Sequence, residues 1–139
     1  MRINAYLSFN GACEEAFRFY EKCLGGKIVA MMRYEDSPMA EKTAPDMLKR
    51  IIHARLEVGE NTIMGGDSPP NYYSKPAGYC NSITVKEPKE AERIFAALGE
   101  NGDIQMSMQE TFWAHRFGML TDKFGTPWMV NCEREGVGG

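Results

Sequence analysis

The sequence predicts an α+β fold in which two tandem β-α-β-β-β modules form a curved mixed sheet around a cavity. Three observations predict this architecture. Apolar residues alternate with polar ones in several short stretches, as in half-buried strands, and recur at helical spacing in two others. In addition, the stretch "EEAFRFYEKCLGGKI" (14–28) resembles "KEAERIFAALGENGDI" (89–104), which divides the chain into two similar halves.

The first module, residues 1–67, opens with "INAYLSF" (3–9), whose alternating apolar side chains predict a strand. Residues 13–24 place apolar side chains at i, i+3, i+4 and i+7, which predicts an amphipathic helix. The helix is expected to end at Gly25, since glycine readily adopts the left-handed conformation that closes helices. Strands are then expected over 27–34, 52–58 and 61–66.

The second module, residues 80–135, repeats this order of elements. Its helix is predicted to start near Pro88, because proline favours the first turn of a helix, and to bury one apolar stripe. Strands are expected over 80–86, 103–112, 115–121 and 126–132. A tight turn over 123–126 should join the last two strands. Together the modules form a single domain of two repeats, because neither has enough apolar faces to stand alone.

Two segments interrupt the repeat. Residues 35–50 are polar and carry two prolines, so they form a long connection that either covers a pocket or contacts a second subunit. Residues 68–79 join the modules and are predicted to be a linker, stiffened by Pro69-Pro70.

Composition limits the possible functions. The 139 residues are 43% hydrophobic and 25% charged, which is typical of a globular protein, and the net charge of −3 argues against a nucleic-acid groove. No apolar run is long enough to cross a bilayer, and no signal peptide is evident at the start of the sequence. We therefore expect a cytoplasmic protein. Its four cysteines are scattered, so we expect reduced thiols packed as small hydrophobic residues.

Three stretches resemble the PhnB-like branch of the vicinal-oxygen-chelate superfamily, which includes glyoxalase I, extradiol dioxygenases and the bleomycin and fosfomycin resistance proteins. They are "YLSFNGACEEAFRFYEKCLGG", "HARLEVGENTIMGGD" and "QETFWAHRFGMLTDKFGTPWMVN". The resemblance implies the glyoxalase/bleomycin-resistance fold, and a homodimer with cavities built at the subunit interface. Sequences of this branch often carry the label 3-demethylubiquinone-9 3-methyltransferase. The glycines here fall at helix ends and hairpin turns, so they do not predict the glycine-rich turn of an S-adenosylmethionine site.

The resemblance also implies where a divalent metal would be held: on the first strand of each module and near the end of the last strand. Those positions are filled here by Asn4, by Cys80 (or Asn81 if the register slips by one) and by Met129. An amide, a thiol and a thioether do not make a site for a hard cation. We therefore expect no metal and no other cofactor, with a soft copper(I) site as the alternative.

Polar side chains remain on the expected cavity face. If Ala54 and Leu56 face the helix, then His53, Arg55 and Glu57 face the cavity. One interpretation is an ion pair, either between Arg55 and Glu57 or across strands, with His53 at a solvated rim. The other is that His53 recognises or deprotonates a ligand, because its ordinary pKa lies near physiological pH.

The region 109–131 is rich in aromatic residues around the predicted last hairpin. The hairpin is surrounded by Phe112, Trp113, Phe117 and Trp128, and aromatic cross-strand pairs stabilise hairpins, which explains most of this pattern. Trp113 and His115 nevertheless lie where a cavity mouth is expected, and apolar walls with a few polar groups suit a small organic ligand. For the methionines of the predicted strands we expect core packing rather than ligand contact.

The sequence thus favours a protein that binds a small organic ligand in a cavity between the modules, without the usual divalent metal of the superfamily. The predicted ligand-binding residues are Asn4, Tyr6, His53, Arg55, Cys80, Trp113, His115 and Met129. The competing hypothesis is an enzyme acting on a small carbonyl or aromatic substrate. In that case His53 is the general base, and Tyr6, Trp113 or Arg55 positions the substrate.

Overall fold

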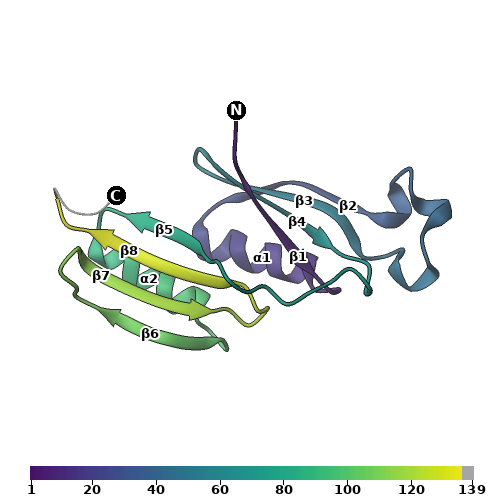
Figure 1. The fold of residues 1–139 in the computed structure, drawn as a ribbon. Coiled ribbons are helices and arrows are strands. Elements are labelled where there is room, and N and C mark those ends of the chain that lie inside the picture. The colour runs from purple at the N-terminus through teal and green to yellow at the C-terminus, as the bar shows by residue number, and fades with distance from the viewer. Residues whose placement is uncertain (136–139) are drawn as a thin grey trace. The chain divides into compact units, whose positions relative to one another are not determined.

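The computed structural model describes residues 1–135, and the chain divides into two compact units, Met1–Ser74 and Lys75–Gly139. Each unit contains a four-stranded mixed sheet with one helix against one face (Figure 1). The strand order is β1-β4-β3-β2 in the first unit and β5-β8-β7-β6 in the second. In both, the first strand pairs in parallel with the last, and the remaining pairs are antiparallel. The α+β class and the β-α-β-β-β order predicted for each half are confirmed.

The first unit contains all the elements predicted for it. They are β1 (Ala5–Phe9), α1 (Cys13–Leu24), β2 (Lys27–Arg33), β3 (Ile51–Val58) and β4 (Asn61–Asp67). The segment between β2 and β3 forms three short 3-10 turns, which are η1 (Tyr34–Asp36), η2 (Ala40–Lys42) and η3 (Pro45–Met47). Figure 1 shows these turns beyond the ends of β2 and β3.

The core of this unit lies between α1 and the sheet. Phe17 and Tyr20 on α1 are fully buried against strand residues such as Leu56, and each such side chain contributes about 1.5 to 3 kcal/mol by its burial. The close approach of α1 requires Gly65 on β4. A Cβ at that position would lie 2.6 Å from the Leu7 carbonyl oxygen and 2.8 Å from the Phe17 ring.

A buried carboxylate holds the start of α1 to the sheet. Asp67 is 2% exposed, and its Oδ1 accepts hydrogen bonds from the backbone N–H groups of Gly11 and Cys13, at 2.7 and 3.1 Å. Its Oδ2 accepts a third from the N–H of Ile51, at 2.9 Å. The first N–H groups of a helix have no partner within the helix, so Asp67 supplies the acceptor that α1 needs.

The second unit follows the same plan. Its elements are β5 (Asn81–Val85), α2 (Pro88–Leu98), β6 (Asp103–Gln109), β7 (Ala114–Thr121) and β8 (Pro127–Glu133). The predicted turn between β7 and β8 is present, with Gly125 at a φ of +90°. Asp122 fixes it by accepting hydrogen bonds from the backbone N–H groups of Phe124 and Thr126 and from the indole N–H of Trp128 at 2.8 Å.

Two packing predictions are wrong. Phe117 and Trp128 do not pair across the last hairpin, because Phe117 lies opposite Asn131 whereas Trp128 lies opposite Leu120, on the α2 side of the sheet. The strand methionines were expected in the core, yet Met47, from a 3-10 turn, is the one methionine among the buried core residues of 1–135. The strand methionines are exposed or half-buried instead, most of them on sheet faces without a helix.

No helix within residues 1–135 has the length and apolar character that crossing a bilayer requires.

Candidate ligand-binding site

The face of the first sheet that α1 leaves uncovered collects the polar residues of β3. The register pairs Tyr6 with Met64 and Met64 with Arg55, so these three side chains form a row across one face. Ala54 and Leu56 are fully buried on the other face, toward α1. His53, Arg55 and Glu57 therefore share the uncovered face, as the alternation predicts.

The rings of Tyr6 and His53 lie side by side on this face. Their centroids are 6.1 Å apart and their planes differ by 27°, which is a stacked arrangement. The Tyr6 hydroxyl donates a long hydrogen bond of 3.4 Å to the Ile52 carbonyl. Burial raises the pKa of the Tyr6 phenol, and Cys13 and Tyr34 raise it further. Tyr6 is therefore a neutral O–H donor at physiological pH.

The ionisable side chains next to these rings are unpaired. Within residues 1–135, Arg55 and Glu57 form no ion pair and no side-chain hydrogen bond, although both are half-buried. His53 has only its ring contact with Tyr6 in the same range. The ion-pair interpretation of this row is therefore wrong. Partial burial without a partner costs free energy, which a complementary ligand group would offset.

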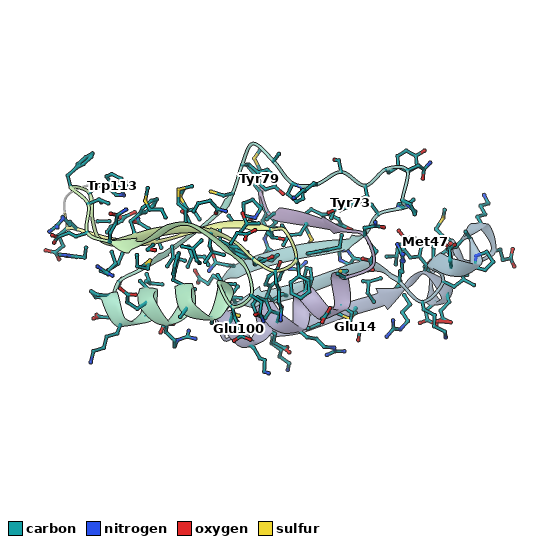
Figure 2. The ribbon with its side chains drawn as sticks, turned by 90° about the horizontal axis from the view of Figure 1, so that it is seen from below. Glu14, Met47, Tyr73, Tyr79, Glu100 and Trp113 are labelled. Atoms are coloured by element: carbon teal, nitrogen blue, oxygen red, sulfur yellow. The ribbon has the colours of Figure 1, made fainter. Side chains whose placement is uncertain are left out.

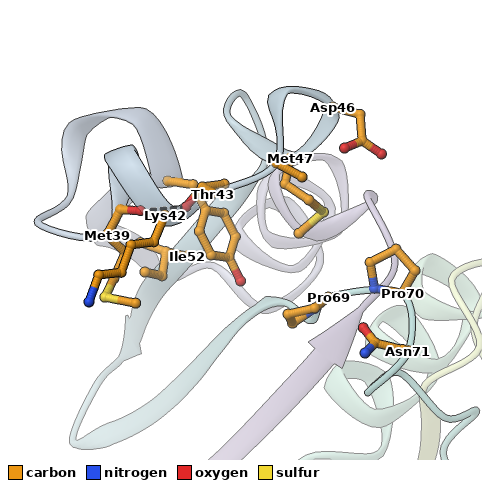
Figure 3. A pocket seen from close by; sticks show the side chains of 11 residues that line it. Met39, Lys42, Thr43, Asp46, Met47, Ile52, Pro69, Pro70 and Asn71 are labelled. Carbon is orange, nitrogen blue, oxygen red and sulfur yellow. Dashed lines mark hydrogen bonds between the residues drawn. The ribbon is translucent and has the colours of Figure 1, made fainter.

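A pocket of about 560 Å³ adjoins this face (Figure 3). Its lining comes from the end of β2, the 3-10 turns, β3 and the stretch after β4, and comprises Tyr34, Met39, Lys42, Thr43, Ala44, Asp46, Met47, Ile52, Pro69, Pro70 and Asn71. Ile52 connects the two regions, because it lines the pocket while its carbonyl accepts the Tyr6 hydrogen bond. Residues of segment 35–50 thus line a pocket, which agrees with one of the two roles predicted for this segment.

The uncovered face of the second sheet is mostly apolar. Ser82, Met129 and Met119 form one row, and Phe117 lies opposite Asn131 in the next. The Trp113 ring packs edge-on against Phe117, with centroids 5.2 Å apart. Figure 2 shows Trp113 at the turn between β6 and β7, on the side of the sheet away from α2.

Asn131 on this face has an unusual environment. It is 9% exposed, and its Oδ1 is buried with no hydrogen-bond partner within residues 1–135. Its Nδ2 reaches Glu133 only at 3.5 Å. A buried acceptor without a donor costs about 1 to 3 kcal/mol, so Asn131 carries an unsatisfied acceptor, among residues 1–135, in a mostly apolar wall.

The other predicted ligand-binding residues lie just outside the strands or at an irregular position within one. Asn4 is exposed and precedes β1, and Cys80 is half-buried and precedes β5. His115 is exposed where the β7–β8 pairing is irregular, and the nearby carboxylate of Glu110 pairs with Arg134. Of the predicted residues, the structure brings Tyr6, His53 and Arg55 together on one face of the first sheet, whereas Trp113 packs against Phe117 and Met129 lies opposite Met119 in the second unit.

Sequence reasoning missed Met64, Asn131 and most of the pocket residues. Asn131 and Met64 follow the strand alternation, so a stricter count of inward and outward positions would have found them. The pocket residues come from irregular turns, which have no periodicity to read.

The donor atoms at the expected metal positions do not fit a hard divalent cation. Asn4, Cys80 and Met129 offer an amide, a thiol and a thioether, whereas such ions prefer carboxylate, imidazole and carbonyl ligands. Among residues 1–135 there is no group of three or more His, Cys, Asp or Glu side chains that could hold a metal ion.

The chain is similar to several known proteins along nearly its whole length. A family model described as 3-demethylubiquinone-9 3-methyltransferase matches residues 1–131. Protein YjdN of Escherichia coli K12 is 34% identical over 146 residues, covering 97% of each chain. The structure of protein PA1353 from Pseudomonas aeruginosa is 46% identical with a TM-score of 0.89, covering 97% of this chain and 99% of that one.

Two further structures define the branch and the fold. The PhnB protein from Bacillus cereus is 27% identical with a TM-score of 0.78, covering 95% of this chain and 99% of its own. A glyoxylase/bleomycin resistance protein/dioxygenase domain from Frankia is 13% identical with a TM-score of 0.66, covering 96% and 98%, and shares the fold. This chain therefore belongs to the PhnB-like 3-demethylubiquinone-9 3-methyltransferase family and has the glyoxalase/bleomycin-resistance fold of the vicinal-oxygen-chelate superfamily.

Proposed function

We propose that this protein binds a small organic ligand on the uncovered face of its first sheet, without the divalent metal of its superfamily. One observation carries the proposal: His53, Arg55 and Glu57 are half-buried beside the Tyr6 ring, and within residues 1–135 their side chains form no ion pair or hydrogen bond. Folding places charged groups there at a cost, and a bound ligand with complementary groups would offset that cost.

The side chains suggest what the ligand looks like. Arg55 presents a planar fork of N–H donors that suits a carboxylate or carbonyl group. The stacked rings of Tyr6 and His53, together with Met64, form an apolar platform for an aromatic or quinone ring. The cavity between the modules remains a prediction, with Asn4, Cys80, Trp113, His115 and Met129 as its further ligand contacts.

The N-termini of the two helices do not favour methyl transfer, the activity named in the family description. A nucleotide-like cofactor is commonly held at a free helix N-terminus after a glycine-rich turn. Here the start of α1 is already occupied by the Asp67 carboxylate, and α2 begins at Pro88, which has no N–H.

An enzyme with His53 as general base is the second candidate. The observation in its favour is that neither ring nitrogen of His53 has a hydrogen-bond partner within residues 1–135, so both nitrogens are free to contact a ligand. A catalytic histidine is ordinarily oriented by a carboxylate or carbonyl group, and Glu57 does not contact it. Binding is therefore better supported than catalysis.

A thermal-shift screen of small aromatic acids and quinones tests the proposal. We expect at least one compound to raise the Tm of the wild-type protein. Arg55→Met should weaken the binding of that compound roughly tenfold, because its charge-assisted hydrogen bonds are lost. Arg2→Met is the matched control, because Arg2 is exposed and precedes β1. Equal binding by wild type and Arg55→Met would contradict the proposal.

The same compound separates binding from catalysis. If His53 is a general base, His53→Ala should abolish turnover while the compound still binds, and product should form with the wild-type protein. If His53 is a ligand contact, binding itself should weaken and no product should form.

Two further features complete the proposal. Protein purified without chelator should contain far less than one equivalent of any transition metal, because the donor set is unsuitable. We also propose a homodimer, which the exposed side chains of Tyr6 and Met32 on the first sheet favour. Sedimentation equilibrium would show a single species near 15.7 kDa if the dimer proposal is wrong.

A further inference from the structure

We propose that the pocket under the 3-10 turns is a second binding site, which takes an amphiphilic organic anion with its acid group at Lys42. This turn pocket, lined by the eleven residues named above, lies entirely within the first unit. Its volume of about 560 Å³ falls within the range of small-molecule sites, which is roughly 300 to 1,000 Å³.

Hydrogen bonds hold the walls of the turn pocket in place without using its open space. The Tyr34 hydroxyl donates to the Asp67 carbonyl at 2.6 Å, which fixes the start of the turns to the end of β4. The base of the segment is closed by backbone bonds, from Tyr34 N–H to Arg50 and from Glu35 N–H to Leu48. The opposite wall is made by Pro69 and Pro70, whose backbone is stiff.

The lining is largely apolar in its middle. Met47 is 5% exposed, and Figure 3 shows it between the turns and Pro69, with Ile52 on the strand behind. Thioether and proline side chains accept flat or irregular apolar groups readily. The pocket therefore offers an apolar slot rather than a polar cradle.

The charged groups lie at opposite ends of this slot. In Figure 3, Lys42 extends beside Met39 at one end, whereas Asp46 lies at the opposite end, beyond Met47. Within residues 1–135 Lys42 has no acidic partner, and the hydroxyl of the neighbouring Thr43 already donates to the Met39 carbonyl at 2.7 Å. Lys42 is thus an uncompensated cation at the rim of an apolar pocket.

This arrangement selects a ligand by charge and shape. An apolar body fits the slot, a single acid group reaches the Lys42 ammonium, and Asp46 disfavours a second acid group at the far end. The residues differ from those of the sheet-face site except at Ile52, which only adjoins it. The two sites can therefore be tested independently.

The test uses the fluorescent probe 8-anilino-1-naphthalenesulfonate and its uncharged analogue N-phenyl-1-naphthylamine. We expect the sulfonate to bind with a Kd roughly fivefold lower than the uncharged analogue, and Lys42→Met to remove that difference. Lys49→Met is the matched control, since Lys49 belongs to the same segment, is 86% exposed and lies beside Glu35 rather than the pocket. It should leave sulfonate binding unchanged.

The location of the probe decides the outcome. In a methyl NMR titration, the Met39 and Met47 signals should shift on addition of the sulfonate. Unchanged signals from both methionines, or equal sulfonate affinity in wild type and Lys42→Met, would overturn the proposal. So would a loss of sulfonate binding in Arg55→Met alone, because that result places the probe on the sheet face. Failure of the thermal-shift screen would leave this test unaffected.

Discussion

The uncovered faces of the two sheets occupy matched positions but differ in chemistry. Arg55 lies opposite Met64 in the first sheet, and Met119 lies opposite Met129 in the second. With these two pairs superimposed, the strand registers match each residue of one uncovered face to a residue of the other. The matched pairs, first unit before second, are Tyr6 and Ser82, His53 and Phe117, Arg55 and Met119, Glu57 and Thr121, Met64 and Met129, and Gly66 and Asn131. Every ionisable residue of the β3 row is replaced in the second unit by one that carries no charge.

This difference shows which features the fold requires and which it leaves free. The faces toward the helices are apolar in both units, because each sheet must bury one face. The outward faces are under no such constraint, so the first carries ionisable side chains that form no ion pair within residues 1–135, and the second is mostly apolar. Substitutions that exchange matched residues should therefore separate stability from binding.

The largest expected effect concerns Asp67, whose matched residue is Cys132. Asp67→Ala should lower the free energy of unfolding by about 3 to 5 kcal/mol, because three backbone N–H groups lose their acceptor. Cys132→Ala should cost only about 1 to 2 kcal/mol, as its thiol makes one weak bond to the Lys86 carbonyl. Urea denaturation measures both, and equal losses would contradict this explanation.

The next largest effect on stability is expected from substitutions that exchange the matched residues Arg55 and Met119. Met119→Arg should lower stability by about 1 to 3 kcal/mol, since it places an unpaired charge on the apolar face. Arg55→Met should change stability by less than about 1 kcal/mol while it weakens ligand binding roughly tenfold. Thermal denaturation of both variants provides the readout. A large loss of stability in Arg55→Met would mean that Arg55 has a structural partner.

Replacing Asn131 with an apolar residue should raise stability rather than lower it. Asn131→Leu removes the unsatisfied Oδ1 and keeps a similar volume, so stability should rise by about 1 kcal/mol. The control is Asn131→Asp, which should destabilise by adding a charge in the same place. If Asn131→Leu destabilises the protein, the amide has a partner, and the wall of the second sheet is polar at that point.

The smallest effect is a pH dependence on the surface of α1. Hydrogen bonds from Arg18 and then Arg33 lower the pKa of Glu14. A carboxyl group whose pKa is lower in the folded state stabilises the protein above its unfolded pKa, and this contribution disappears as the pH falls through the folded pKa. Glu14→Gln should therefore cost at most ~1 kcal/mol at neutral pH, and this cost should vanish as the pH falls through the lowered pKa of Glu14. Denaturation across this pH range checks the sign.

The strands and helices could be predicted from the sequence because both periodicities are strong. The limits of α1 follow from its apolar stripe and from Gly25, and those of α2 from Pro88. The alternation in β3 likewise predicted that His53, Arg55 and Glu57 share a face. Local pattern suffices wherever one side of an element must be buried.

The rest depends on contacts between distant residues. Asp67 bonds to Gly11, 56 positions away, and no local pattern marks that contact. The separation of Phe117 from Trp128 follows from the register that the turn after Thr121 sets, in which Phe117 lies opposite Asn131 and Trp128 opposite Leu120. The turn pocket arises where irregular turns meet the end of β4, so neither its volume nor Lys42 could be anticipated.

Methionine-methyl NMR tests the central claim most directly, because methionines mark each candidate surface separately. Met64 reports on the first sheet face, Met129 on its matched position, and Met47 on the turn pocket. When the best compound from the thermal-shift screen is added, the Met64 signal should shift in wild type, and in Arg55→Met the same shift should require roughly tenfold more compound. Saturable binding that leaves the Met64 signal unchanged would contradict the assignment of ligand recognition to this face.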